Sequence, residues 1–198
     1  MIDEIMGHGS TTGQEDKGRI LLTLAKSAIS EKMGVSLNDD IPVNAPWLSE
    51  KGACFVTLKI NGDLRGCIGS IEAYRPLLQD VVANAVAAAF HDPRFPPLGP
   101  EEFDHLRIEV SVLGPLKPIQ ARDEGDFLGQ LKPGIDGIIF EYGPHRATFL
   151  PQVWEQLPDP REFLAHLKLK AGLNADFWHP DVLLYRYKVE KYKEESER

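Results

Sequence analysis

Residues 64–70 read LRGCIGS and hold the residue types of this chain that are best suited to covalent chemistry. Arg65 lies two positions before Cys67, so the two side chains would share one face of a strand. Positive charge near a cysteine favours the thiolate, which is the nucleophilic form. Gly66 and Gly69 carry no side chains that would cover the backbone beside the thiol. The pattern therefore predicts Cys67 as a nucleophile.

A structural interpretation of the same residues stays open. A small cysteine often fills space within a sheet, and glycine in a strand often marks only a bulge or a close backbone approach. The direction in which Cys67 points decides between the two interpretations, and that direction depends on a hairpin.

The hairpin is predicted from two strands, over residues 53–60 and 64–71, separated by the turn sequence Asn-Gly-Asp. A two-residue loop would turn Arg65 toward the apolar face of the first strand, which would bury a charge. We therefore predict a three-residue loop over residues 61–63. This register pairs Ile60 with Leu64 and Val56 with Ile68.

In this register Cys67 faces away from the apolar side of the sheet, next to Thr57 and with Lys59 as its cross-strand neighbour. Cys54 points to the opposite face. Because a disulfide needs converging Cβ vectors, we expect both cysteines to be free thiols.

Two further segments supply groups that could join Cys67. Arg94 lies in the sequence DPRFPP after a predicted long helix, and Glu109 and Ser111 share the polar face of a strand predicted over 106–113. If this strand lies beside the hairpin, the arginines would favour the thiolate or hold an anionic substrate, and Glu109 or a histidine would move protons. The predicted catalytic residues are Cys67, Arg65 and Glu109, and the predicted ligand-binding residues are Arg65, Gly66, Gly69, Ser70, Arg94 and Ser111.

Each of these residues also has a simpler interpretation. Arg94 could bind loop carbonyls and cap the preceding helix, and Glu109 could lie on a solvated strand face. No metal site is predicted, because the chain has no Cys-x-x-Cys, no His-Glu-x-x-His and no close carboxylate triplet. No cofactor is predicted either.

Composition limits the class of protein. The chain has 198 residues, with 22 Lys and Arg against 30 Asp and Glu, for a formal net charge of −8. This balance argues against nucleic-acid binding through phosphate attraction. No apolar run approaches the ~18 residues that a membrane helix needs. With only two cysteines and a start that does not resemble a secretory signal, we expect the protein to be cytoplasmic.

The periodicity predicts an α+β fold with a largely antiparallel sheet flanked by helices, because strands are joined by hairpins as often as by helices. We expect a flexible N-terminal segment over residues 1–14, one domain over 15–190 and a charged, frayed tail over 191–198. Helices are predicted from about residue 16 to 33, from 76 to about 92 and from 160 to 171; further strands are predicted over 137–142, 146–150 and 182–190, and a linker from 114 to about 133.

The segment 64–70 resembles the signature of the AMMECR-type proteins, whose pattern reads L-R-G-C-I-G followed by Ser or Thr. Three other stretches match the same family in order, at residues 55–57, 92–97 and 147–153. The resemblance implies a compact α+β protein with a larger and a smaller lobe. In bacteria and archaea it also implies association with a Memo-like protein and a radical-SAM protein, as the A component of an AmmeMemoRadiSam system. The family has no established catalytic activity.

We therefore expect a cytoplasmic AMMECR-type protein that acts as a Cys-dependent enzyme, or enzyme component, on a small anionic molecule. The alternative is a non-catalytic ligand-binding or interaction module that serves the Memo-like and radical-SAM partners. Neither interpretation requires nucleic acid or a membrane.

Overall fold

The structure is a computed structural model that describes residues 11–35 and 44–194. It divides into two compact units. Unit 1 is the chain up to Val112 together with the residues from Lys191 onward, and unit 2 is Leu113–Glu190. Both units combine helices with antiparallel strands, so the predicted α+β class is confirmed.

Unit 1 is built around a four-stranded sheet with the strand order β10-β5-β2-β3. Strand β2 pairs antiparallel with both β3 and β5, and β1 and β4 form a separate two-stranded pair. The elements are α1 (Thr11–Met33), α2 (Pro46–Ser49), β1 (Lys51–Gly52), β2 (Cys54–Ile60), β3 (Asp63–Gly69), β4 (Arg75–Pro76), α3 (Leu77–Phe90), α4 (Pro100–Phe103), β5 (Leu106–Leu113) and β10 (Val189–Lys193).

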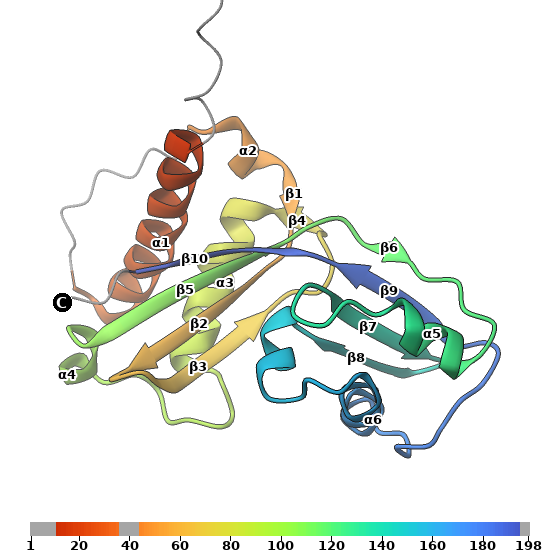
Figure 1. The fold of residues 1–198 in the computed structure, drawn as a ribbon. Helices are drawn as coiled ribbons and strands as arrows, with labels where there is room; N and C mark the ends of the chain where they lie inside the picture. Colours follow the sequence, from red (N-terminus) through yellow and green to blue (C-terminus); the bar gives the residue numbers. More distant parts are fainter. Residues whose placement is uncertain (1–10, 36–43, 195–198) are drawn as a thin grey trace, which may run out of the picture. The chain divides into compact units, whose positions relative to one another are not determined.

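Helix α3 covers one face of this sheet, and α1 packs against α3 (Figure 1). The buried stripe of α3 includes Val81, Ala85 and Ala88, which meet Val56 and Leu58 in the core. Small alanines on this stripe let the helix come close to the strands. The side chains that alternate with Val56 and Leu58 therefore point to the opposite face of the sheet, away from α3.

Unit 2 is a second antiparallel sheet, with the order β6-β9-β7-β8, and a core that includes Phe127, Phe163 and Trp154. The rings of Trp154 and Phe163 stack 3.8 Å apart. The elements are β6 (Lys117–Pro118), α5 (Glu124–Gln130), β7 (Gly137–Tyr142), β8 (His145–Phe149), a 3-10 helix (Pro151–Glu155), α6 (Pro160–Lys170) and β9 (Leu183–Tyr187).

Most predicted elements are present within a few residues, but four details differ. Helix α1 begins at Thr11, so residues 11–14 lie in a helix, while residues 1–10 are outside the described part. The expected linker contains α5, which is capped by Asp123 and anchored by the buried Phe127. The single strand expected over 182–190 is two strands, β9 and β10. Strand β10 continues to Lys193, so the start of the expected tail is part of the sheet.

The predicted three-residue loop of the first hairpin is wrong. Asn61 and Gly62 adopt positive φ values of 53° and 89° and form a two-residue turn, so Ile60 lies opposite Asp63 rather than Leu64. Such a turn needs a left-handed backbone at both positions, which Asn and Gly tolerate best.

A β-bulge resolves the burial problem that argued against the two-residue turn. Leu64 lies opposite Lys59 and Gly66 lies opposite Leu58, so Arg65 is the extra residue on β3. Beyond the bulge the predicted pairing of Val56 with Ile68 is confirmed.

Among the helices within residues 11–35 and 44–194, none is both long enough and apolar enough to cross a bilayer.

Gly66 is required by the close approach of β3 to α3. A Cβ atom at this position would lie 2.1 Å from the backbone carbonyl oxygen of Ala88. Gly66→Ala should lower the free energy of unfolding by about 1–3 kcal/mol, because the helix backbone must move away from the sheet. The measurement is urea unfolding followed by far-UV circular dichroism.

Gly129→Ala is the matched control. Gly129 lies in α5, has no atom within 4 Å of a built Cβ and does not need a positive φ. We expect this substitution to leave stability unchanged or to raise it by about 0.5–1 kcal/mol. Equal loss of stability in both variants would contradict a role for the β3–α3 contact.

Candidate functional site

The backbone of Cys67 is held from outside the sheet, because β3 is an edge strand. The Cys67 amide donates to Oδ2 of Asp92 at 2.9 Å. Nη2 of Arg94 donates to the Cys67 carbonyl oxygen at 3.3 Å. The side chains of the DPRFPP segment thus take the place of a neighbouring strand and close the edge. Two of the segments that carry the family resemblance meet at Cys67.

Asp92 and Arg94 form a tight ion pair. Oδ1 of Asp92 accepts from the Arg94 amide and from Nε, and Oδ2 accepts from Nη2 at 2.7 Å. The Asp92 side chain is only 2% exposed, whereas that of Arg94 is 53% exposed. Hydrogen bonding by Arg94 holds the pKa of Asp92 well below its usual range, against the opposing effect of burial. The charge of Arg94 is therefore matched by the carboxylate that accepts from the Cys67 amide.

Arg65 forms a second ion pair, with Glu102. Its Nε and Nη2 donate to the two carboxylate oxygens of Glu102, at 2.7 and 2.9 Å. Hydrogen bonding by Arg65 lowers the pKa of Glu102, which also accepts from the Gly99 amide. The buried Nη1 of Arg65 has no hydrogen-bond partner among the described residues. Arg65 thus fastens the bulged part of β3 to α4.

Ser70 belongs to a buried network at the start of α3. Its hydroxyl donates to Oδ1 of Asp80 at 2.6 Å and accepts from Nδ2 of Asn84 at 3.2 Å. Asp80 is fully buried and also accepts from Nε of Arg75 and from the Cys54 amide. The Ser70 hydroxyl is therefore occupied within the protein.

Gly69 and Ser111 lie in the row of side chains next to that of Cys67, on either side of Phe55. A Cβ atom at Gly69 would lie 2.3 Å from the ring of Phe55, so this glycine makes room for the ring. Ser111 is 4% exposed. Gly66 and Gly69 thus have the close-packing role that the structural interpretation of the motif expects.

The thiol of Cys67 lies on the sheet face away from α3, as predicted. Its cross-strand neighbour is Thr57, which corrects the expected neighbour Lys59. Sγ of Cys67 and Oγ1 of Thr57 are 3.3 Å apart. Thr57 in turn lies opposite Glu109 on β5, so three strands place Glu109, Thr57 and Cys67 in one row.

Glu109 is held by two lysines. Its Oε1 accepts from Nζ of Lys59 at 2.8 Å, and its Oε2 lies 3.6 Å from Nζ of Lys191. Burial raises the pKa of Glu109, but the hydrogen bond from Lys59 and the charges of both lysines together lower it. Glu109 is therefore ionised and has both oxygens engaged, which makes it a weak proton acceptor as it stands.

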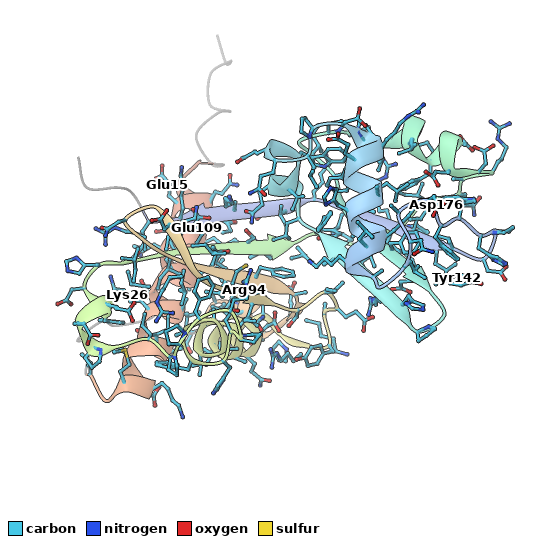
Figure 2. The ribbon with its side chains drawn as sticks, turned by 90° about the horizontal axis from the view of Figure 1, so that it is seen from below. Glu15, Lys26, Arg94, Glu109, Tyr142 and Asp176 are labelled. Atoms are coloured by element: carbon cyan, nitrogen blue, oxygen red, sulfur yellow. The ribbon has the colours of Figure 1, made fainter. Side chains whose placement is uncertain are left out.

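Thr57 and Lys191 are absent from the predicted set of site residues. Thr57 could have been found from the alternation of β2, because it shares a face with Lys59. No pattern near Lys191 in the sequence indicates that it lies beside Glu109. Lys191 belongs to β10 and follows Glu109 by more than 80 residues in the chain. In Figure 2, Arg94 and Glu109 extend from different elements of unit 1, the loop after α3 and β5.

Cys54 has the opposite environment. It is fully buried on the α3 side of the sheet, and burial raises the pKa of its thiol. Both cysteines are free, as predicted. Of the two, Cys67 is partly exposed and Cys54 is fully buried.

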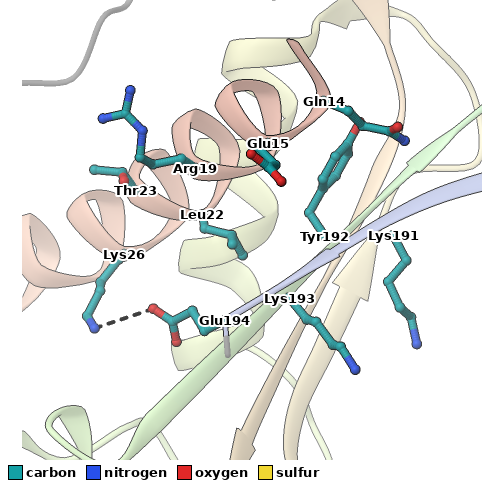
Figure 3. Close-up of a pocket in the computed structure, with 11 residues that line it drawn as sticks. Gln14, Glu15, Arg19, Leu22, Thr23, Lys26, Lys191, Tyr192, Lys193 and Glu194 are labelled. Atoms are coloured by element: carbon teal, nitrogen blue, oxygen red, sulfur yellow. Dashed lines mark hydrogen bonds and ion pairs between the residues drawn. The ribbon is translucent and has the colours of Figure 1, made fainter. Parts of the chain in front are cut away.

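A separate cavity of about 820 Å³ lies between α1 and β10 (Figure 3). An ion pair of 3.4 Å between Lys26 and Glu194 borders it, and none of the predicted site residues lines it. In the described part of the chain, no three His, Cys, Asp or Glu side chains are grouped so that they could hold a metal ion.

Comparisons with known proteins identify similar chains. The family model described as AMMECR1 matches residues 22–192. A protein of Methanothermobacter thermautotrophicus is 39% identical over 184 residues, which cover 91% of this chain and 96% of that protein. Protein MJ0810 of Methanocaldococcus jannaschii is 43% identical over 154 residues, covering 76% and 77% of the two chains. The crystal structure of the uncharacterized protein PH0010 from Pyrococcus horikoshii superposes with a TM-score of 0.80 at 39% identity, covering 90% of this chain and 91% of that one.

The Asp92 carboxylate should make folding stability depend on pH. Because its pKa is lower in the folded protein than in the unfolded chain, its contribution is complete above about pH 4 and is lost as the pH falls below that value. Asp92→Asn should lower the free energy of unfolding by about 2–3 kcal/mol at pH 7. The loss relative to the parent should shrink between about pH 4 and pH 2.

The comparison is made by urea unfolding at each pH, with Asp104→Asn as control. Asp104 is exposed and follows α4, and within residues 11–35 and 44–194 its side chain forms no hydrogen bond or ion pair. The interpretation fails if the two variants have the same pH profile.

Proposed function

Because the chain belongs to the AMMECR1 family, which has no established activity, we propose that it acts through the Cys67 thiol, as a Cys-dependent enzyme or enzyme component that acts on a small anionic molecule. The observation that carries this proposal is the fixed backbone of Cys67 beside a partly exposed thiol on the polar sheet face. Within the family we place the protein with the A components of AmmeMemoRadiSam systems, on the resemblance of residues 64–70, 92–97 and 147–153.

A nucleophile has to be held in one position relative to its substrate. The hydrogen bonds from the Cys67 amide and carbonyl to Asp92 and Arg94 limit the movement of the strand at this residue. Gly66 and Gly69 support the same point, because the residues on both sides of Cys67 are packed tightly against α3 and Phe55. The position of the sulfur is therefore determined by both neighbouring elements.

Thr57 is the hydrogen-bond partner of the thiol. A threonine hydroxyl can accept a hydrogen bond from the thiol or donate one to the thiolate, so it can serve both states of Cys67. Glu109 comes next in the row, and it can take a proton only after an anionic substrate has drawn Lys59 away from Oε1.

The attraction for an anion comes from the lysines rather than from the arginines. Arg65 and Arg94 are each paired with a carboxylate, so we assign them to holding β3 in place. Lys59 and Lys191 share the single carboxylate of Glu109, which leaves one positive charge uncompensated beside the row. A small anion would be bound there at short range, since exposed charges are screened beyond about 10 Å.

The cytoplasm is the expected location, because two free thiols suit a reducing compartment.

The proposal is tested by alkylation of the native full-length chain with iodoacetamide at pH 7, followed by mass spectrometry of the modified peptides. We expect Cys67 to react faster than a small reference thiol and Cys54 to stay unmodified until the chain unfolds. Thr57→Val should change the rate at Cys67, and Thr57→Ser, which keeps the hydroxyl, should restore it.

Two cysteine variants serve as controls. Cys67→Ser should abolish the fast reaction, whereas Cys54→Ala should leave it in place. Should Cys67 react no faster than the reference thiol, the protein is better described as a non-catalytic module serving Memo-like and radical-SAM partner proteins. In that case Cys67→Ser would leave the recovery of those partners from a native extract unchanged.

A further inference from the structure

Unit 2 contains a cavity of about 490 Å³ that is lined by four positively charged side chains. They are Lys117, Lys132, Arg186 and Lys188, and the only carboxylate in the lining is that of Asp136. The chain as a whole has a formal net charge of −8, so this concentration of positive charge stands out against its composition. None of the predicted site residues takes part in it.

The sheet of unit 2 brings three of these cations together. Lys117 on β6 lies opposite Arg186 on β9, and cross-strand partners share a face. Lys188 is two residues after Arg186. The Gly114 amide donates to the Lys188 carbonyl at 2.8 Å, so the segment before β6 stays alongside the chain that leaves β9.

Asp136 binds the backbone of Lys132, which is the fourth cationic residue of the cavity, and the side chain of Arg186. Its carboxylate is buried, accepts from the Lys132 amide at 3.0 Å and lies 3.4 Å from Nη1 of Arg186. Arg186 also donates through Nη2 to the Gln130 carbonyl at 2.9 Å. The indole of Trp154 donates to the Asp136 carbonyl at 2.8 Å. Of the charged groups in the lining, buried Asp136 and partly buried Arg186 are thus paired with each other.

The three lysines differ from Arg186 in their side-chain contacts. Within residues 11–35 and 44–194, the side chains of Lys117, Lys132 and Lys188 form no ion pair and no side-chain hydrogen bond. All three are exposed at the cavity. Four cations against one carboxylate leave three uncompensated positive charges, and their mutual repulsion opposes folding unless an anion binds among them.

We propose that this cavity binds the phosphate group of a small phosphorylated molecule. A phosphate group carries between one and two negative charges near neutral pH and offers several acceptor oxygens, so it can engage several lysines where a carboxylate could not. The volume lies within the range of small-molecule sites, about 300–1,000 Å³. Ile135, which is 49% exposed, and Pro115 also line the cavity and offer apolar contact to an organic group.

The proposal does not depend on the proposed function, because it uses no residue of unit 1. Loss of phosphate binding and loss of thiol reactivity are separate results. Cys67→Ser should bind phosphate probes as the parent does.

The test is isothermal titration calorimetry of the full chain at 150 mM salt with inorganic phosphate and with phenyl phosphate. We expect saturable binding with a stoichiometry of one. The double variant Lys117→Gln/Lys188→Gln should bind at least about tenfold more weakly, because it loses two charge-assisted contacts. Lys132→Gln alone should weaken binding by a smaller factor. Without ligand, the unfolding midpoint of each lysine variant should equal or exceed that of the parent, because each variant removes repulsion between positive charges.

Lys51→Gln is the matched control, because it removes one charge from an exposed lysine on β1 in unit 1. It should leave binding unchanged. Tighter binding of phenyl phosphate would identify an organic phosphate as the ligand, and equal binding would identify the free ion. The proposal is overturned by non-saturable binding, by an equal effect of Lys51→Gln, or by a single-stranded oligonucleotide that binds this cavity more tightly than either probe.

Discussion

The carboxylate of Asp92 connects the parts of unit 1 on which the candidate site depends. An edge strand presents unpaired amides and carbonyls, and burying them without partners costs free energy. Asp92 satisfies the Cys67 amide and, through Arg94, the Cys67 carbonyl. Because Asp92 lies two residues after the last residue of α3, its side chain links the end of the helix to the edge strand and to the loop that holds Arg94. Without it, the row of Cys67 and Thr57 would end at a free edge.

The same constraint explains why the arginines of the motif are poor evidence for an active site. A guanidinium group close to a cysteine suggests activation when only the sequence is known. In the structure, Arg65 reaches Glu102 and Arg94 reaches Asp92, each in a hydrogen-bonded ion pair. Such pairs hold two segments in a defined geometry, and the carboxylate of each pair offsets part of the charge of its arginine. A charge that is already paired positions the chain, whereas an unpaired one can attract a ligand.

Much of the fold could be predicted because it follows from local patterns. The alternation in β2 and β5 assigned their faces, and the sequence Asp-Pro at 159–160 predicted the start of α6, where the Asp159 side chain accepts from two amides. Helix α5 was missed because two glycines weaken its pattern, and its formation depends on burying Phe127. The turn was missed because the bulge at Arg65 depends on Glu102, 37 residues away. Register near a bulge is decided by tertiary contacts that no window of sequence contains.

The residues of the candidate site also differ in whether local sequence patterns could place them. Strand period assigned Cys67 and Glu109 to the polar faces of their strands, but their meeting was predicted only on the condition that β5 lies beside the hairpin, which the structure shows. Lys191 could not be placed, because β10 joins the sheet beside β5 from the far end of the chain. The uncompensated charge at the Glu109 end of the row therefore comes from a residue outside every recognisable motif. It exists only once β10 has paired beside β5. For this protein, the motifs specify a rigid support for the sulfur, and the surrounding tertiary structure supplies the electrostatics that would select a ligand.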